Sequence, residues 1–368
     1  MENLSKDYGY WEARFKAQDM AAFNHNSSAL IWLKVKAISR KELIEKFITE
    51  NNINLASSKV REQGAELFGI LDEKPWQEAM AMLDKFLTDR NNEWYEAKGV
   101  DEVSLKSDLY KVQNYEWGGD QNNSLDKYLV SHYVKTISDY GLLLSRQGDI
   151  ANNAWNYVQT SWYNNWTSYL IESIFKRHKR VVSAVGEIKG VDFFIGDIPL
   201  DLKVTFFPQQ FMEERLKVKL GKRQLTWLRQ EAKKAGITVD RELPDAQQMY
   251  MLCERLYQSG QMGSLDRLKA VRKEIVDEAI NDKTALMQWL YEKQGEMRFG
   301  AENRIFVILA DSDDMTQSWK LKRNFDLIEP RIKNYLDDFD EKSLATVKFQ
   351  YHGNKYNSMA DIIFVVKQ

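Results

Sequence analysis

The feature that most constrains this chain is the stretch 190–205, which predicts two short strands joined by a tight turn. The Gly-Asp pair at 196–197 is typical of a two-residue hairpin loop, because glycine tolerates the positive φ of a type II′ turn. A loop centred there places Asp192 directly across from Asp201. Because side chains alternate between the two faces of a strand, Lys203 shares the face of Asp201. The stretch therefore predicts an amphipathic hairpin with two aspartates and one lysine on its polar face.

Two opposed aspartates need a compensating partner. Residues that face each other across an antiparallel pair lie roughly 4.5–5.5 Å apart at Cβ, and like charges there are destabilising. A divalent cation such as Mg²⁺, with Mn²⁺ as a substitute, prefers hard carboxylate oxygens at this separation. Lys203 could then hold a phosphate or a nucleophilic water. The alternative is an ordinary solvated face, on which Lys203 neutralises both aspartates.

The composition limits the classes of protein to be considered. The 368 residues suffice for two domains, 43% of them are apolar, and the formal net charge is −2. A nearly neutral chain is not a generally basic nucleic-acid binder, so a polyanion site has to be a local patch. One cysteine excludes an internal disulfide, and four scattered histidines exclude a standard zinc cluster. With no apolar run of membrane-spanning length and no signal peptide, we expect a cytoplasmic protein without membrane contact.

The pattern of periodicity predicts two regions. Residues 1–120 are expected to form a mostly helical accessory domain, and turn-forming residues place a linker near 115–125. Residues 121–368 are expected to form an α/β domain with a helical insertion at about 237–300. Its predicted helices cover 125–144, 155–179, 222–234 and 318–338, and its predicted strands beyond the hairpin cover 304–310, 345–351 and 361–367. In the second of these helices, a stripe of apolar residues is expected to face the core: Trp162, Trp166, Leu170 and Ile174.

Further charged residues surround the hairpin. Glu172 allows two interpretations, an exposed i,i+4 ion pair with Lys176 or a third carboxylate at the metal, and Glu187 is a nearby rival for that role. Nine Lys and Arg stand against three Glu between residues 203 and 234, which suits a phosphate backbone. The expected nucleic-acid contacts are Lys176, Arg177, Lys179, Arg180, Lys217, Lys219, Lys222, Arg223, Lys320, Lys322 and Arg323.

A second acidic cluster follows the apolar strand 304–310. Asp311 and Asp313 could form a metal site of the topoisomerase-primase (Toprim) kind. That site also requires a Glu after an earlier strand, and the sequence offers no convincing one. The other interpretation is acidic capping of the helix that follows.

The order of these elements resembles the core of the PD-(D/E)XK nuclease superfamily, the restriction-endonuclease-like fold. The resemblance covers roughly residues 155–235 and 303–330, and it rests on a helix with Glu172, the hairpin with Asp192 and Asp201-Leu202-Lys203, a helix and a buried strand. Val191 stands where the motif's name has proline. The resemblance implies an α/β fold with a mixed sheet flanked by helices. It also implies that Asp192, Asp201 and Glu172 are metal ligands and that Lys203 is the catalytic lysine.

The activity implied by this resemblance is Mg²⁺-dependent hydrolysis of phosphodiester bonds in double-stranded DNA. A type II-like restriction or phage-defence role is the family's analogy. A homodimer is expected as well, because cutting both strands takes two sites. The principal rival is a nucleic-acid-binding module that keeps the fold without the chemistry.

Overall fold

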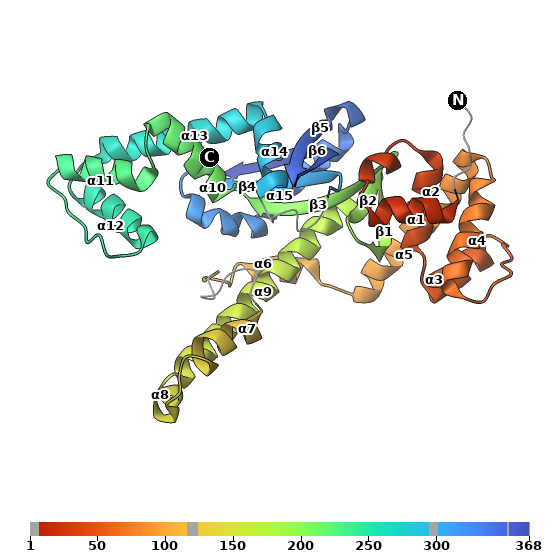
Figure 1. The fold of residues 1–368 in the computed structure, drawn as a ribbon, viewed down its shortest axis with the longest axis horizontal. Coiled ribbons are helices and arrows are strands. Elements are labelled where there is room, and N and C mark those ends of the chain that lie inside the picture. The colour runs from red at the N-terminus through yellow and green to blue at the C-terminus, as the bar shows by residue number, and fades with distance from the viewer. Residues whose placement is uncertain (1–6, 116–123, 294–300, 352, 368) are drawn as a thin grey trace.

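The protein is an α/β protein with one six-stranded mixed sheet and helices on both of its faces (Figure 1). The computed structural model describes residues 7–115, 124–293, 301–351 and 353–367. The proposed linker near 115–125 falls almost wholly outside these residues. No helix in the described ranges combines the length and the apolar character that crossing a bilayer requires.

The sheet has the order β1-β2-β3-β4-β6-β5. Its strands are β1 (Val181–Ile188), β2 (Val191–Ile195), β3 (Ile198–Phe206), β4 (Arg304–Asp311), β5 (Ala345–Tyr351) and β6 (Asn354–Lys367). The first three strands are antiparallel neighbours, β3, β4 and β6 run parallel, and β5 is antiparallel to β6. All eight residues of β4 are buried, as expected for a central strand covered on both faces. The predicted strands 304–310 and 345–351 are confirmed, and the last strand begins earlier than expected.

The hairpin predicted within residues 190–205 is present in the predicted register. Phe193 pairs with Leu200, and Ile195 pairs with Ile198, which leaves the Gly-Asp pair as the loop. Gly196 has φ +57, while the aspartate after it is outside the left-handed region, as in a type II′ turn. Both faces near the turn are covered, because Phe193 and Phe194 are fully buried in two different clusters.

The N-terminal helices pack against the β1 and β2 end of the sheet (Figure 1). They are α1 (Tyr8–Lys16), η1 (Met20–Phe23), α2 (Ser27–Ala37), α3 (Lys41–Glu50), α4 (Val60–Asp72), α5 (Trp76–Lys98) and α6 (Glu102–Leu109). The approach is closest at Gly186 of β1, where a Cβ would lie 1.9 Å from the carbonyl oxygen of Ala37. Glycine is therefore required there for the helical region and the sheet to meet.

Two helical layers enclose the sheet. On one face lie α9 (Gln147–Lys176) and α15 (Phe325–Asp337), which share a core cluster with Leu200 and Val307. On the other face, α14 (Thr284–Lys293) contacts β5 and β6. It shares a core cluster with α10 (Gln209–Leu220), α11 (Gln224–Lys234), α12 (Asp245–Gln258) and α13 (Met262–Asn281), of which α11 and α12 extend beyond the sheet (Figure 1). The expected insertion thus forms one layer with the helices just before it, and α10 was not predicted. The helix expected over 318–338 is divided into the 3₁₀ segment η3 (Met315–Arg323) and α15, and η4 (Glu341–Ser343) precedes β5.

A helical arm projects from the body of the molecule (Figure 1). It consists of the N-terminal half of α9 with α7 (Leu125–Leu129), the π-helical turn η2 (Val130–Val134) and α8 (Tyr140–Ser145). The prediction of one continuous helix over 125–144 is therefore wrong, because the chain has to reverse before it enters α9. The expectation that Trp162 faces the core is also wrong, since its side chain is 36% exposed, although Leu170 of the same stripe is buried.

Candidate active site at the open edge of the hairpin

Asp192 and Asp201 meet where β2 stops pairing with β3. The last cross-strand pair joins Phe193 and Leu200, and from Asp201 onward β3 pairs only with β4 among the described strands. At this point the backbone N–H of Leu202 donates a 2.8 Å hydrogen bond to Asp192 Oδ2 instead of to a strand carbonyl. The carboxylate of Asp192 thus takes the place of a strand carbonyl as hydrogen-bond acceptor, and this contact brings it toward Asp201.

The two carboxylates repel each other. Burial, followed by the negative charge of Asp201, raises the pKa of Asp192 to about 6. Glu172 adds to this rise, and Lys176 opposes it. The end of α9 therefore lies within electrostatic reach of Asp192, which one of the two interpretations of Glu172 requires.

Glu172 itself forms the ion pair that the simpler interpretation predicted. Its Oε2 lies 3.1 Å from the Nζ of Lys176. Both interpretations of Glu172 remain compatible with this arrangement, because the pair lies beside Asp192. The rival Glu187 is on β1, and its side chain lies outside the described part of the structure.

Sequence reasoning missed Arg304, which contacts Asp201, and Glu302, which contacts Arg304. Arg304 donates from Nε to Asp201 Oδ2 at 2.7 Å and from Nη2 to Glu302 Oε2 at 2.7 Å. Burial raises the pKa of Glu302, which is 4% exposed, to about 7. The available signal was a charged Glu-Asn-Arg segment directly before an apolar strand. The pairing of Asp201 with Arg304 in neighbouring parallel strands is visible only in the structure.

A second lysine lies near Lys203. Lys322 is 7% exposed, and its Nζ donates to Asn164 Oδ1 at 3.1 Å. Burial, followed by the positive charge of Lys203, lowers the pKa of Lys322 to about 8. Lys203 and Lys322 therefore repel each other, as Asp192 and Asp201 do.

The carboxylate pair fits a small divalent cation. Asp192 and Asp201 supply hard oxygen ligands, and a cation would relieve the repulsion that raises the pKa of Asp192. Arg304 already neutralises part of the charge of Asp201, so the ion would share that carboxylate. Among the residues that the structure describes, no three His, Cys, Asp or Glu side chains gather into a ready metal-binding group.

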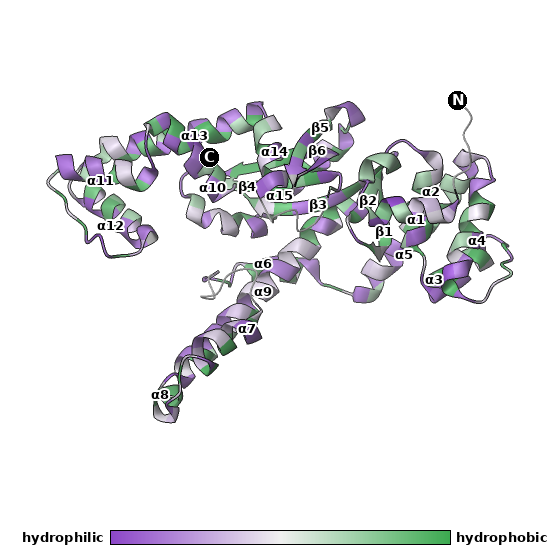
Figure 2. Ribbon diagram, viewed as in Figure 1, coloured by the Kyte–Doolittle hydropathy of each residue, from purple (hydrophilic) through white to green (hydrophobic). Residues whose placement is uncertain are grey.

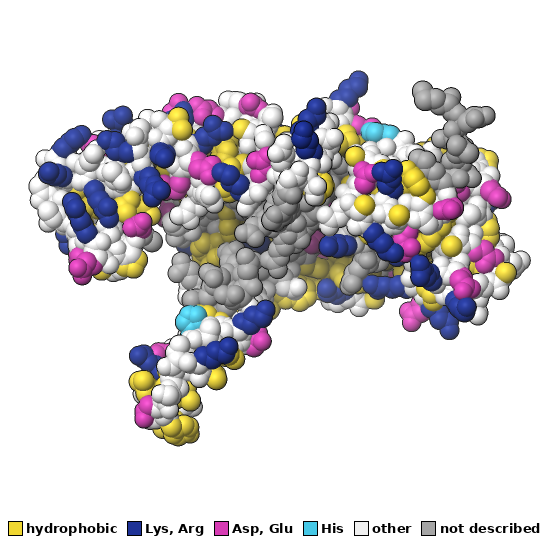
Figure 3. All heavy atoms as spheres, in the orientation of Figure 1, with side chains coloured by type: hydrophobic (Ala, Val, Ile, Leu, Met, Phe, Trp, Pro, Cys, Tyr) yellow, Lys and Arg dark blue, Asp and Glu magenta, His cyan; other side chains and the backbone are white. Residues whose placement is uncertain are grey.

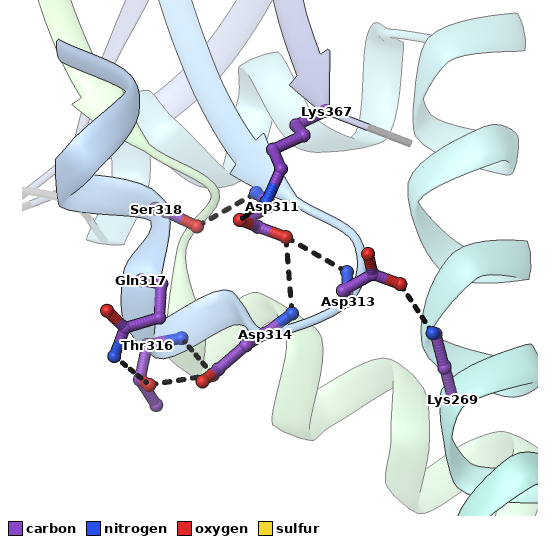
Figure 4. A network of polar contacts seen from close by, with 8 residues as sticks. All are labelled: Lys269, Asp311, Asp313, Asp314, Thr316, Gln317, Ser318 and Lys367. Atoms are coloured by element: carbon purple, nitrogen blue, oxygen red, sulfur yellow. Dashed lines mark hydrogen bonds and ion pairs between the residues drawn. The ribbon is translucent and has the colours of Figure 1, made fainter. Parts of the chain in front are cut away.

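The acidic cluster after β4 has a different character (Figure 4). Asp311 accepts hydrogen bonds from the backbone N–H groups of Asp313 and Asp314, and its Oδ2 lies 2.9 Å from Lys367 Nζ. Asp313 forms an ion pair with Lys269. Asp311 and Asp313 thus have separate cationic partners, and the capping of η3 is done by Asp314, whose side chain accepts a hydrogen bond from the N–H of Thr316. They line a cavity of about 350 Å³ at the C-terminal end of β4.

Most of the expected nucleic-acid contacts have partners within the protein. Lys322 and Arg323 are buried, and Arg323 donates to the carbonyl oxygens of Leu109 and Val112. Arg180 binds three carbonyl oxygens at the end of α15 and just beyond it. Four others form ion pairs with acidic side chains: Lys176, Arg177, Lys179 and Lys219.

The exposed basic residues lie mainly elsewhere. Lys222 bonds Gln230, while Lys217, Arg223 and Lys320 are exposed. Figure 3 shows Lys and Arg gathered over α11 to α13, on the outer side of the insertion. A basic surface therefore exists over α11 to α13.

Comparison with known protein families, with curated proteins and with solved structures found no match to this chain.

Proposed function

We propose that this chain is a metal-dependent nuclease that hydrolyses DNA phosphodiester bonds on a core like that of the PD-(D/E)XK superfamily. The observation that carries the proposal is the pair of mutually repelling carboxylates at the open edge of β3, where Lys203 follows Asp201 by two residues on the same strand. Lys203 and Lys322 in turn repel each other. A divalent cation would relieve the repulsion between the carboxylates, and a phosphate group would relieve the repulsion between the lysines. A nuclease binds both a metal ion and a phosphate.

The order of elements supports the same proposal. The helix α9, the antiparallel strands β1 to β3, the helices α10 and α11 and, after three further helices, the parallel strand β4 occur in this order in the chain. The order is compatible with the resemblance, in which α11 corresponds to the helix expected at 222–234. A restriction or phage-defence role rests on the analogy with that superfamily.

Each side chain has a definite task in this proposal. Asp192 and Asp201 would hold Mg²⁺, which when bound lowers the pKa of water and offsets the charge of the phosphate. The Leu202 N–H orients the carboxylate of Asp192, and Arg304 orients that of Asp201. Lys203 holds the scissile phosphate or the nucleophilic water.

Lys322 strengthens the attraction for the phosphate. Its pKa of about 8 leaves it mainly protonated at neutral pH. Its bond to Asn164 fixes the ammonium group against α9. An anion placed near both lysines therefore meets two positive charges in a partly dehydrated environment, where electrostatic attraction is stronger than in water.

The test is cleavage of supercoiled plasmid in Mg²⁺ by the wild type, Asp192→Asn and Lys203→Ala, with Asp313→Asn as the matched control. The amide introduced by Asp192→Asn retains an oxygen for the Leu202 N–H, so the fold should persist. We expect cleavage by the wild type and the control, and loss in the other two. Cleavage that survives in both site variants would refute the assignment of the site.

Two outcomes would favour the rivals. A wild type that binds DNA but cleaves neither single- nor double-stranded DNA nor RNA would favour the non-catalytic binding module. Activity lost in Asp313→Asn but retained in Asp192→Asn would favour the Toprim-like site. Isothermal titration with Mg²⁺ alone provides an independent readout, since the wild type should bind the ion more tightly than Asp192→Asn does.

A further inference from the structure

The helical arm has an apolar surface that the rest of the described structure does not cover. Eight of the sixteen exposed large hydrophobic side chains in the described ranges lie between residues 130 and 162. No side chain of α7, η2 or α8 belongs to one of the three core clusters. Figure 2 shows hydrophobic positions recurring out to the end of the arm, and Figure 3 shows apolar side chains at its tip. Surfaces of this kind mark interaction sites.

The exposed large hydrophobic residues of α9 form a single stripe. Trp155 is 62% exposed, Val158 52% and Trp162 36%, and the spacing of three and four residues places them on one side of the helix. Gly148 and Ala151 extend the stripe toward the tip, and Asn165 ends it. These six positions follow the a and d pattern of a coiled-coil seam: Gly148, Ala151, Trp155, Val158, Trp162 and Asn165. The other side of α9 contacts the short helices of the arm, as in the 2.8 Å bond from Asn153 to Tyr133.

The charge of the arm excludes an anionic partner. Between residues 125 and 162 there are three Lys or Arg and three Asp. From 150 to 171, α9 has no charged residue. A nucleic acid or an acidic membrane surface requires basic side chains around the apolar stripe. Among macromolecular partners, this uncharged stripe suits a protein surface.

We propose that this stripe pairs with the same stripe of a second copy of the chain, in antiparallel orientation. In an antiparallel pair, an a position of one helix faces a d position of the other. Trp155 then faces Val158 of the second copy, and Trp162 faces Ala151. Each layer joins a large side chain to a smaller one, which allows close packing. A parallel pair would instead place each tryptophan against its own equivalent and leave the alanine layer empty.

The available area suits a weak dimer. The three exposed hydrophobic side chains of the stripe, Trp155, Val158 and Trp162, offer apolar surface on the order of 300 Å². This is less than the roughly 800 Å² that one partner contributes to a standard interface. The contact is the same patch on both copies, so a two-fold axis closes it and no open filament follows. The inference goes beyond the proposed function and does not depend on it, because none of the seam residues is in the candidate active site.

Sedimentation velocity of the full chain tests the pairing. We expect a dimer for the wild type at micromolar concentration, and a dissociation constant raised at least a hundredfold in Trp155→Glu/Val158→Glu. Both side chains are exposed within one copy, so the variant should fold with the helical content of the wild type, measured by circular dichroism. The matched control is Val103→Glu, an 81% exposed residue of α6 outside the arm, which should remain a dimer. A wild type that stays monomeric at tens of micromolar, or a dimer unaffected by the double substitution, would overturn the proposal.

Disulfide trapping tests the orientation. In the antiparallel register, residue 148 faces residue 165 of the second copy, whereas within one chain they are separated by about 25 Å of helix. In a Cys253→Ser background, Gly148→Cys/Asn165→Cys should form a covalent dimer on oxidation, and Gly148→Cys alone should not. A covalent dimer of the single variant would show a parallel pair and overturn the orientation. Asp192→Asn should cross-link as the parent does, which separates this result from any failure of the nuclease proposal.

Discussion

The two acidic clusters of the sheet have the same kind of side chain and opposite electrostatic situations. At the end of β4, Asp311 is bonded to Lys367 and to two backbone N–H groups, and Asp313 is paired with Lys269. At the open edge of β3, Asp192 has a raised pKa because of burial and of the nearby Asp201. Paired carboxylates stabilise a fold, whereas carboxylates that repel each other cost stability. The cluster at the edge of β3 is therefore the better candidate for binding a ligand.

Substitutions in the two acidic clusters should differ most in their effect on the cleavage rate. Asp192→Asn removes one of two proposed ligands of the metal, and we expect a plasmid-cleavage rate at least about 100-fold below that of the wild type. Asp313→Asn should cleave at the wild-type rate, because Asp313 is exposed and paired away from the edge of β3. Initial rates at saturating Mg²⁺ measure both. Equal losses in the two variants would remove the distinction between the clusters.

The substitution Asp192→Asn should raise the free energy of unfolding, although it lowers the cleavage rate. Its pKa rises from 3.8 in the unfolded chain to about 6 in the folded one. The folded state therefore binds the proton more tightly, and the wild type loses stability as the pH rises from about 4 to about 6. Asp192→Asn avoids this loss, so it should be more stable than the wild type at pH 7.5, by up to about 3 kcal/mol.

Urea unfolding at several pH values measures this effect. The gain in stability should disappear below about pH 4, where Asp192 of the wild type is protonated in both states. A variant that is both more stable and inactive at pH 7.5 is the expected mark of a residue retained for binding a ligand. A stability gain that is constant from pH 4 to 8 would contradict the assigned cause.

Asp311 should show a loss of stability where Asp192 shows a gain. Asp311→Ala leaves the N–H groups of Asp313 and Asp314 without their acceptor and removes the partner of Lys367. We expect a loss of about 1–3 kcal/mol in urea unfolding, with cleavage per folded molecule unchanged. Asp311→Asn, which retains one oxygen acceptor, is the control and should recover part of the loss. An inactive but fully stable Asp311→Ala would transfer the catalytic role to this cluster.

The sequence predicted the parts of the site that depend on local rules. The loop residues set the register of the hairpin, so the approach of Asp192 to Asp201 followed from counting along two strands. Glu302 and Arg304 could not be found in this way, because their contacts depend on how β4 is staggered against β3 across a separation of about a hundred residues. The parallel register is determined by packing of the whole sheet and not by a turn.

The outer helices were predicted less well, for a related reason. Basic residues after helical segments suggested a surface for nucleic acid, but Arg180 and Arg323 are used to bind carbonyl oxygens inside the fold. A charge in the sequence does not reveal whether it satisfies a helix end or faces solvent. The stripe of Trp162 and Leu170 likewise has helical spacing, yet α9 leaves the body of the protein partway along this stripe, so that only its C-terminal end is buried.

The lysines near the two ends of the comparison, Lys367 at the end of β4 and Lys322 near Lys203 of β3, also differ in their partners. Lys367 is bonded to Asp311, while Lys322 is bonded to Asn164 and lies near Lys203. Lys322→Gln should raise the KM for DNA about tenfold, equal to about 1.4 kcal/mol, with a smaller effect on kcat. Because the pKa of Lys322 is lowered to about 8, the KM of the wild type should rise above pH 8. Lys322→Arg should postpone that rise to higher pH, whereas a pH profile identical in all three proteins would exclude a role for this charge.

The exposed pair at the end of β4 should give the smallest effect. The side chains of Lys269 and Asp313 are 56% and 52% exposed, and solvent and salt screen the attraction between them. Lys269→Gln should therefore leave the melting temperature and the cleavage rate unchanged within error, and Asp313→Asn should do the same. Differential scanning calorimetry in low and high salt is the measurement. A clear destabilisation of both variants at low salt would mean that Asp313 supports the capping arrangement around Asp311, and the two acidic clusters would then differ less than their partners suggest.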